Sequence, residues 1–234
     1  MAEQVKNFVN GQYVTPATDE PSVPVTNPTT GEVFAHVPVT NAVGVDEAVR
    51  FAKEAQAKWQ KQTMKTRVQS LFKLKHLMEE HMEKLVDMVV QEHGKAKPEA
   101  KAEVMKGIET IEWATSLPQL ACGRFEEVSR GISCRDWREP LGVVVSIVPF
   151  NFPIMVPMWT VPIALGCGNA VILKPSEKVP MSMQFIASLM KQAGIPDGVF
   201  QTVNGTRSTC EALIDHPDVK AVTFVGTSSI FATD

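Results

Sequence analysis

The chain reads LGVVVSIVPFNFPIMVPMWTVPIALGCGNAVIL from residue 141 to residue 173, and this stretch contains no charged side chain. An uncharged stretch of this length is long enough to span a membrane. However, Pro149, Pro153, Pro157 and Pro162 interrupt it, and the longest apolar piece between them is about one strand long. The pattern therefore predicts a buried strand, an apolar helix and a second buried strand, and no membrane span.

The alternation of strands and helices continues toward the end of the chain. We expect strands at 141–148, 170–173, 199–203 and 221–225, and helices at 154–165, 180–193 and 208–215. Strands that alternate with helices at this spacing form right-handed βαβ units around a parallel sheet. The sequence thus predicts an α/β fold with a four-stranded parallel sheet whose last strand ends at Val225.

Two hairpins are predicted outside this region. Within residues 5–39, which read as short strands and turns, the Asn10-Gly11 pair between apolar residues is a strong hairpin signal. Residues 124–139 alternate around Gly131, which predicts a polar hairpin that projects from the body.

Residues 45–112 change to a helical period. One helix buries alanines and Trp59, a second carries an apolar stripe that Gly94 ends, and a third has Pro98 in its first turn. The second stripe consists of Leu71, Leu74, Met78, Leu85 and Val89. We expect the whole stripe to lie on one helix.

Composition excludes several classes of protein. The 234 residues include 23 Lys+Arg and 26 Asp+Glu, a net charge of −3, with 44% hydrophobic and 21% charged residues. This composition is globular, and its near-neutral charge disfavours a nucleic-acid or membrane-surface protein. The 4 cysteines form no C-x-x-C pair, so we expect neither a zinc ribbon nor another metal site. The opening residues resemble neither a signal peptide nor a transit peptide, which predicts a cytoplasmic location.

The distinctive polar residues of the second half follow the expected strands. Ligands of open parallel sheets bind at the carboxyl ends of the strands. Those ends carry Asn151, Lys174, Ser176, Glu177, Gly205, Gly226 and Thr227. Their common position predicts a binding site at this edge of the sheet.

The residues alone leave two interpretations of each group open. Lys174 and Glu177 can hydrogen-bond ribose hydroxyls or form a solvated ion pair in a loop. Gly226 and Thr227 can open a helix that binds phosphate or form an ordinary cap. Asn151 can donate its amide to a developing oxyanion or simply form a turn. The G-x-G-x-x-G fingerprint of dinucleotide sites is absent.

Three motifs resemble the aldehyde dehydrogenase superfamily: PFNFP at 149–153, GNAVILKPSE at 168–177 and HPDVKAVTFVGT at 216–227. The resemblance extends over essentially the whole chain. Phe150, where many members have Trp, and the residues at 155–159 and 167–169 are similar to the CoA-acylating methylmalonate-semialdehyde dehydrogenases. Those enzymes oxidise malonate or methylmalonate semialdehyde with NAD and release acetyl-CoA or propionyl-CoA.

The resemblance implies a role for individual residues. Asn151 corresponds to the amide of the oxyanion hole, and Lys106 lies where close relatives tend to have an Arg near the substrate carboxylate. The resemblance implies nine NAD-binding residues. Val148 and Phe150 lie on the nicotinamide side, and Lys174, Ser176, Glu177 and Lys178 lie around the adenosine ribose. The others are Gly205, Gly226 and Thr227, and Thr227 opens the helix that meets the pyrophosphate. CoA is the implied co-substrate.

The resemblance also implies an incomplete enzyme. The nucleophilic Cys, the general-base Glu and the catalytic domain of the family correspond to positions beyond residue 234, and none of the four cysteines matches the nucleophile. Cys167 is expected to be a small buried core residue. Phe231 stands where the family has a second Gly, which would crowd the cofactor. We therefore expect this chain by itself to be inactive.

The implied organisation has three parts. They are an N-terminal hairpin and helical part at 1–123, an oligomerisation hairpin at 124–140 and an incomplete Rossmann-like NAD-binding core at 141–234. The family implies a small-molecule aldehyde as substrate and a homo-oligomer, either a dimer or a tetramer. Two alternatives remain: another aldehyde dehydrogenase, such as a succinate-semialdehyde type, and a non-catalytic protein that binds a nucleotide or a partner.

Overall fold

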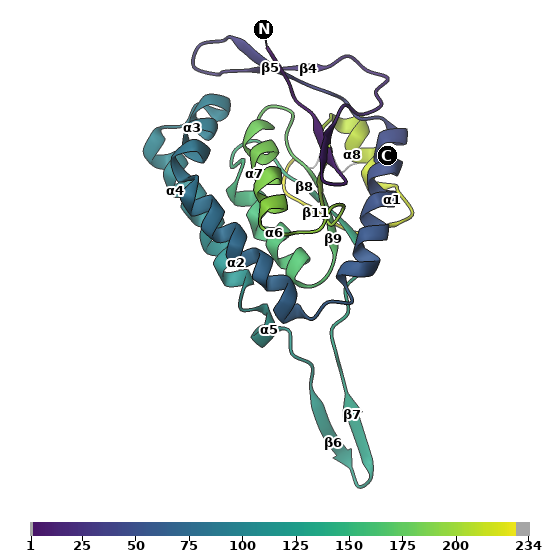
Figure 1. Cartoon of the computed structure of the whole chain (residues 1–234). Helices are drawn as coiled ribbons and strands as arrows, with labels where there is room; N and C mark the ends of the chain where they lie inside the picture. Colours follow the sequence, from purple (N-terminus) through teal and green to yellow (C-terminus); the bar gives the residue numbers. More distant parts are fainter. Residues whose placement is uncertain (1, 228–234) are drawn as a thin grey trace.

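A six-stranded sheet forms the centre of the molecule in the computed structural model, which describes residues 2–227 (Figure 1). The strand order is β11-β8-β9-β10-β2-β3. These strands are β2 (Asn7–Val9), β3 (Gln12–Val14), β8 (Val143–Ile147), β9 (Ala170–Lys174), β10 (Phe200–Thr202) and β11 (Val219–Phe224). The four strands from β11 to β10 are parallel, which confirms the α/β fold class and the parallel core.

The sequence predicted a sheet of four strands, but the sheet has six. The N-terminal hairpin β2–β3 adds two antiparallel strands beside β10, with Thr202 opposite Phe8. Its turn is formed by Asn10 and Gly11, both at positive φ, as the hairpin signal predicted. The prediction failed because the pairing joins segments at opposite ends of the chain, for which short-range patterns give no signal.

The two central strands consist almost entirely of apolar residues because both of their faces are covered. Every residue of β8 and β9 is buried, and the side chains alternate between two hydrophobic clusters. One face packs against α6 (Met155–Gly166) and α7 (Met181–Gln192), and the other packs against α1 (Ala42–Trp59) and α8 (Arg207–Ile214). The 33-residue uncharged stretch is thus β8, α6 and β9. No helix within residues 2–227 is long and apolar enough to cross a membrane.

An outer layer of helices covers α6 and α7 (Figure 1). It contains α2 (Met64–Glu80), α3 (Met82–His93) and α4 (Lys97–Ala114), followed by the short α5 (Leu117–Leu120), which the sequence reasoning missed. The stripe expected on one helix is divided between α2 and α3, because His81 adopts φ −97° and ψ 19° and breaks the helix. Gly94 ends α3 at φ 79°, and Pro98 lies in the first turn of α4, as predicted.

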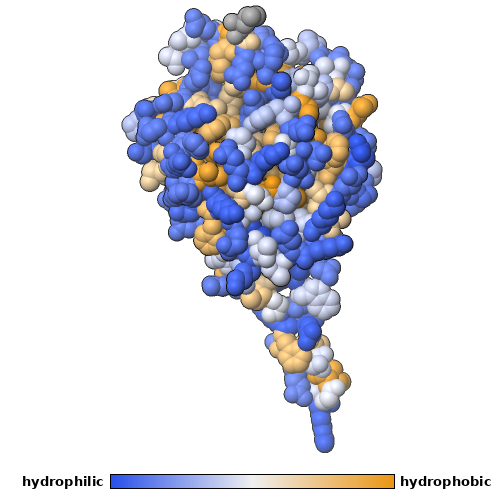
Figure 2. Space-filling model, in the orientation of Figure 1, coloured by the Kyte–Doolittle hydropathy of each residue, from blue (hydrophilic) through white to orange (hydrophobic). Residues whose placement is uncertain are grey.

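Two smaller sheets lie outside this body. The strands β1 (Glu3–Gln4), β4 (Val23–Thr26) and β5 (Val33–Val37) form one of them, in the order β1-β5-β4, and Met181 at the start of α7 packs against its core. The hairpin of β6 (Phe125–Ser129) and β7 (Ile132–Arg135) projects away from the body, and all of its strand residues are exposed (Figure 1). Figure 2 shows hydrophobic side chains among the polar ones along this projection.

Candidate functional site

The carboxyl ends of β8, β9 and β11 enclose one cavity of ≈ 220 Å³. Eight of the nine residues expected to bind a cofactor line it: Val148, Phe150, Lys174, Ser176, Glu177, Lys178, Gly226 and Thr227. The parallel register of the three strands brings them together, because it aligns the strand ends at one edge of the sheet. The helix expected to open at Thr227, and Phe231, lie outside the described residues.

Lys174 is the last residue of β9, and its side chain is only 6% exposed. Its Nζ lies 3.4 Å from Oε2 of Glu177, whose side chain is 31% exposed. A buried ammonium group is stable only when it is paired, and Glu177 supplies that partner. The pair presents donors and an acceptor to the same cavity, which suits a ligand that carries hydroxyl groups.

Phe150 and Lys178 form the outer wall of the cavity. Lys178 Nζ lies 4.7 Å from the centroid of the Phe150 ring, a cation–π contact. The backbone N–H of Lys178 donates to Ser176 Oγ at 3.3 Å, so Ser176 closes the turn that presents Lys178. Two lysines at one cavity favour a ligand with an anionic group, and the Phe150 ring offers it a flat apolar surface.

Cys210, on α8, is the one cysteine that lines this cavity. It is 1% exposed, and burial raises the pKa of its thiol, although nearby Lys174 acts in the opposite direction. A buried thiol that stays protonated is a poor nucleophile. Cys167 follows α6 and packs against the main core as expected, but it is half-buried rather than buried.

Asn151 lies next to Phe150 at the rim, is exposed and does not line the ≈ 220 Å³ cavity. Its backbone carbonyl accepts a hydrogen bond from Lys95 Nζ at 2.9 Å. The loop that carries Asn151 is therefore tied to the connection between α3 and α4. The role of its side chain toward an oxyanion stays a prediction.

The structure does not bring Gly205 and Lys106 to the cavity. Gly205 has φ 158°, and a Cβ there would lie 1.9 Å from Thr209 Oγ1, so the absence of a side chain allows α8 to pack closely. Lys106 is exposed on α4 and forms an ion pair with Glu109. Their roles toward a cofactor and a substrate stay predictions.

The sequence reasoning missed Glu92 and His93, which line a second cavity of ≈ 440 Å³. This cavity shares Phe150, Glu177 and Lys178 with the first, and residues of β4 also line it. Burial raises the pKa of Glu92 to about 7. The available signal was spacing, since Glu92 continues the buried side of α3 after Leu85 and Val89.

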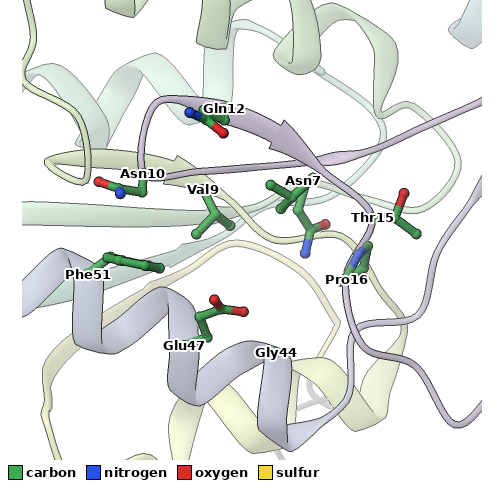
Figure 3. Close-up of a pocket in the computed structure, with 10 residues that line it drawn as sticks. Asn7, Val9, Asn10, Gln12, Thr15, Pro16, Gly44, Glu47 and Phe51 are labelled. Carbon is green, nitrogen blue, oxygen red and sulfur yellow. The ribbon is translucent and has the colours of Figure 1, made fainter.

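A third cavity of ≈ 400 Å³ lies between the β2–β3 hairpin and α1 (Figure 3). Figure 3 shows the carboxylate of Glu47 facing the hairpin, and Glu47 is the only titratable residue in the lining. Asn7 at this cavity already donates to Thr40 Oγ1 and accepts from the Asn204 backbone. This cavity shares no residue with the strand-end cavity, which we take as the candidate site. No group of three or more His, Cys, Asp or Glu side chains among residues 2–227 is placed to hold a metal ion.

Comparison with known proteins identifies the family. Residues 13–232 match the model of the aldehyde dehydrogenase family. Malonate-semialdehyde dehydrogenase 2 of Geobacillus kaustophilus is 44% identical over 229 residues, which is 97% of this chain and 47% of the relative. The methylmalonate-semialdehyde dehydrogenase of Oceanimonas doudoroffii superposes with a TM-score of 0.94 at 38% identity, over 98% of this chain and 47% of that one.

An aldehyde dehydrogenase of Bacillus cereus, solved as its NAD⁺ complex, superposes with a TM-score of 0.92 at 31% identity, over 97% of this chain and 47% of that chain. The chain thus spans about half the length of the curated relatives it matches, and the matched half includes the sheet and the strand-end cavity. By sequence and by fold, this chain belongs to the aldehyde dehydrogenase family.

Proposed function

We propose that this chain forms the NAD-binding part of a semialdehyde dehydrogenase of the CoA-acylating, methylmalonate-semialdehyde type. The observation that carries the proposal is the ≈ 220 Å³ cavity, where paired Lys174 and Glu177, the Phe150 ring and Thr227 meet at the strand ends. The names of two relatives reported above support the substrate class, which is malonate or methylmalonate semialdehyde.

The donor set of the cavity fits a dinucleotide. Lys174 and Glu177 are placed to bind the two hydroxyls of the adenosine ribose, since one supplies N–H donors and the other an anionic acceptor. Val148 and Phe150 supply apolar surface for the nicotinamide side, and Lys178 adds positive charge close to that wall. When bound, NAD accepts the hydride that the aldehyde carbon loses on oxidation.

The described residues contribute one further element of the chemistry. Asn151 is the candidate donor to the oxyanion that develops when a thiolate attacks the aldehyde. No described cysteine suits that attack, because the thiol at the cavity, Cys210, is buried and its pKa is raised. We therefore expect no NADH when the chain is mixed with NAD⁺, CoA and malonate semialdehyde. Enzyme-dependent formation of NADH would contradict this part of the proposal.

Calorimetric titration of the full chain with NAD⁺ tests the binding site. Lys174→Met keeps the buried aliphatic stem and removes the charge. A charge-assisted hydrogen bond contributes about 1.5–3 kcal/mol, so we expect the affinity to fall by about 10- to 100-fold. The control is Lys73→Met, at an exposed position on α2 that does not line the cavity. Equal affinity for the two variants, or no binding to the unmodified chain, would overturn the proposal.

The projecting hairpin supports a further proposal, namely that it contacts another subunit. Phe125, Val128 and Ile132 are 65%, 53% and 57% exposed on the two strands. A two-stranded hairpin without a hydrophobic core is marginally stable in water, so apolar side chains along it favour docking onto another surface. The family resemblance indicates a second copy of the same protein as the partner.

A further inference from the structure

The two helices that begin beside the candidate site lack caps of their own. α6 follows the loop that carries Phe150 and Asn151, and α7 follows the loop that carries Lys178. Their N-cap residues are Ile154 and Pro180, and neither provides a capping hydrogen bond. The first N–H groups of a helix have no partner inside the helix and need an acceptor when they are buried.

Glu92 supplies that acceptor for α7. Its carboxylate accepts from the backbone N–H groups of Met181 at 2.7 Å and Ser182 at 3.1 Å, across 89 and 90 residues of sequence. Glu92 is 3% exposed and Ser182 is fully buried. The contact joins the end of α3 to the start of α7, directly after the loop that holds Ser176, Glu177 and Lys178.

Glu103 supplies the acceptor for α6. Its Oε1 accepts from the N–H of Ile154 at 2.9 Å, and its other oxygen is paired with Lys95. Lys95 also donates to the carbonyl of Asn151 at 2.9 Å and lies 4.4 Å from the centroid of the Phe152 ring. The side chains of Lys95 and Glu103 are 9% and 1% exposed, so the pair is buried.

We infer that Glu92 and the Lys95–Glu103 pair are positioning residues that hold the two ends of the nucleotide site. Glu92 fixes the loop with Glu177 and Lys178, which faces the adenosine ribose. Lys95 and Glu103 fix the loop with Phe150 and Asn151, which faces the nicotinamide. All three belong to α3, α4 and their short connection, so one rigid unit sets the spacing of both loops. This inference rests on the proposed function of the cavity.

The affinities for two ligands, NAD⁺ and ADP-ribose, distinguish effects at the two ends of the site. NAD⁺ contains both ends, whereas ADP-ribose lacks the nicotinamide. Methionine at these positions keeps the buried volume and removes the acceptors and charges. We expect Glu92→Met to weaken NAD⁺ and ADP-ribose equally, by about tenfold, which is the size of effect expected for one lost hydrogen bond. We expect Lys95→Met/Glu103→Met to weaken NAD⁺ by about tenfold and ADP-ribose by less than about twofold.

The matched control is Glu99→Met, an exposed carboxylate in the first turn of α4, which should change neither affinity. Where a methionine variant does not fold, Glu92→Gln and Lys95→Met/Glu103→Gln replace it, because glutamine keeps one acceptor. If these residues serve only to stabilise the fold, Glu92→Met and the double variant should each lower the stability of the chain and its affinity for both NAD⁺ and ADP-ribose. That outcome, or a loss of binding in the control, would overturn the inference.

Amide hydrogen exchange tests the positioning without any ligand. We expect Glu92→Met to accelerate exchange at Met181 and Ser182 alone. The N–H of Met155 also donates to Glu103 Oε1, at 3.4 Å, so we expect the double variant to accelerate exchange at Ile154 and Met155 alone. If the unmodified chain binds no NAD⁺, the proposed function fails, and the exchange pattern still decides whether these residues anchor the two helices. Unchanged exchange at both helix starts would overturn the positioning role.

Discussion

The strands β9 and β11 both consist mainly of apolar residues but have very different surroundings. Both belong to the parallel part of the sheet and both pair with β8. All five residues of β9 are buried, because β8 and β10 flank it and helices cover both faces. β11 pairs with β8 alone among residues 2–227, and none of its six residues is fully buried. Position in the sheet, rather than β-propensity, therefore decides how far each strand is buried, and we expect the more buried strand to contribute more to stability.

Truncation of side chains at equivalent positions is the strongest test of this comparison, because Ile172 and Val222 both lie beside Val145 of β8. Ile172 in β9 is fully buried, so Ile172→Ala should cost about 3–4 kcal/mol of the free energy of unfolding. Val222 in β11 is only partly buried, so Val222→Ala should cost about 1 kcal/mol. Urea unfolding of both variants measures the difference. Equal costs would show that β11 is as well packed as the centre.

The carboxyl group of Glu92 is titratable although it is buried in the protein. The pKa of Glu92 is about 7 in the folded chain and 4.5 as an ordinary value, because burial disfavours its charged form. The folded state therefore keeps a proton that the unfolded state releases between these values. Stability is lost as pH rises through this window, by about 3 kcal/mol in total.

The pH dependence is checked by urea unfolding at about pH 5 and about pH 7.5. Relative to the unmodified chain, Glu92→Met should be more stable at the higher pH than at the lower one, by about 2–3 kcal/mol. Glu99→Met serves as the control, since this carboxylate is exposed. A difference that is the same at both pH values would mean that Glu92 titrates normally.

The projecting hairpin extends the comparison to residues outside the body. Ile132 is 57% exposed, so Ile132→Ser should change the free energy of unfolding by less than about 0.5 kcal/mol. If the hairpin contacts a second copy, the same change should lower the fraction of oligomer in sedimentation velocity runs. A large loss of stability in the monomer would mean that the hairpin packs on its own body, in contrast to its exposed position.

Much of the candidate site could be predicted from the sequence because its residues follow parallel strands. Once the alternation of strands and helices is recognised, geometry requires Lys174, Phe150 and Thr227 to meet at one edge of the sheet. Residues that depend on other elements were harder to place. Gly205 also follows a strand, yet its lack of a side chain makes room for Thr209 of α8.

The sequence by itself determined the fold class, the βαβ order, the two hairpins and the cluster at the strand ends, because these depend on periodicity and turn chemistry over short distances. Only the tertiary structure decided the pairing of β2 with β10, the break at His81 and the capping of α7 by Glu92. Each depends on groups brought together by the packing of distant segments. The capping role of a buried carboxylate in a helix can be recognised only when the tertiary structure shows which N–H groups donate to it.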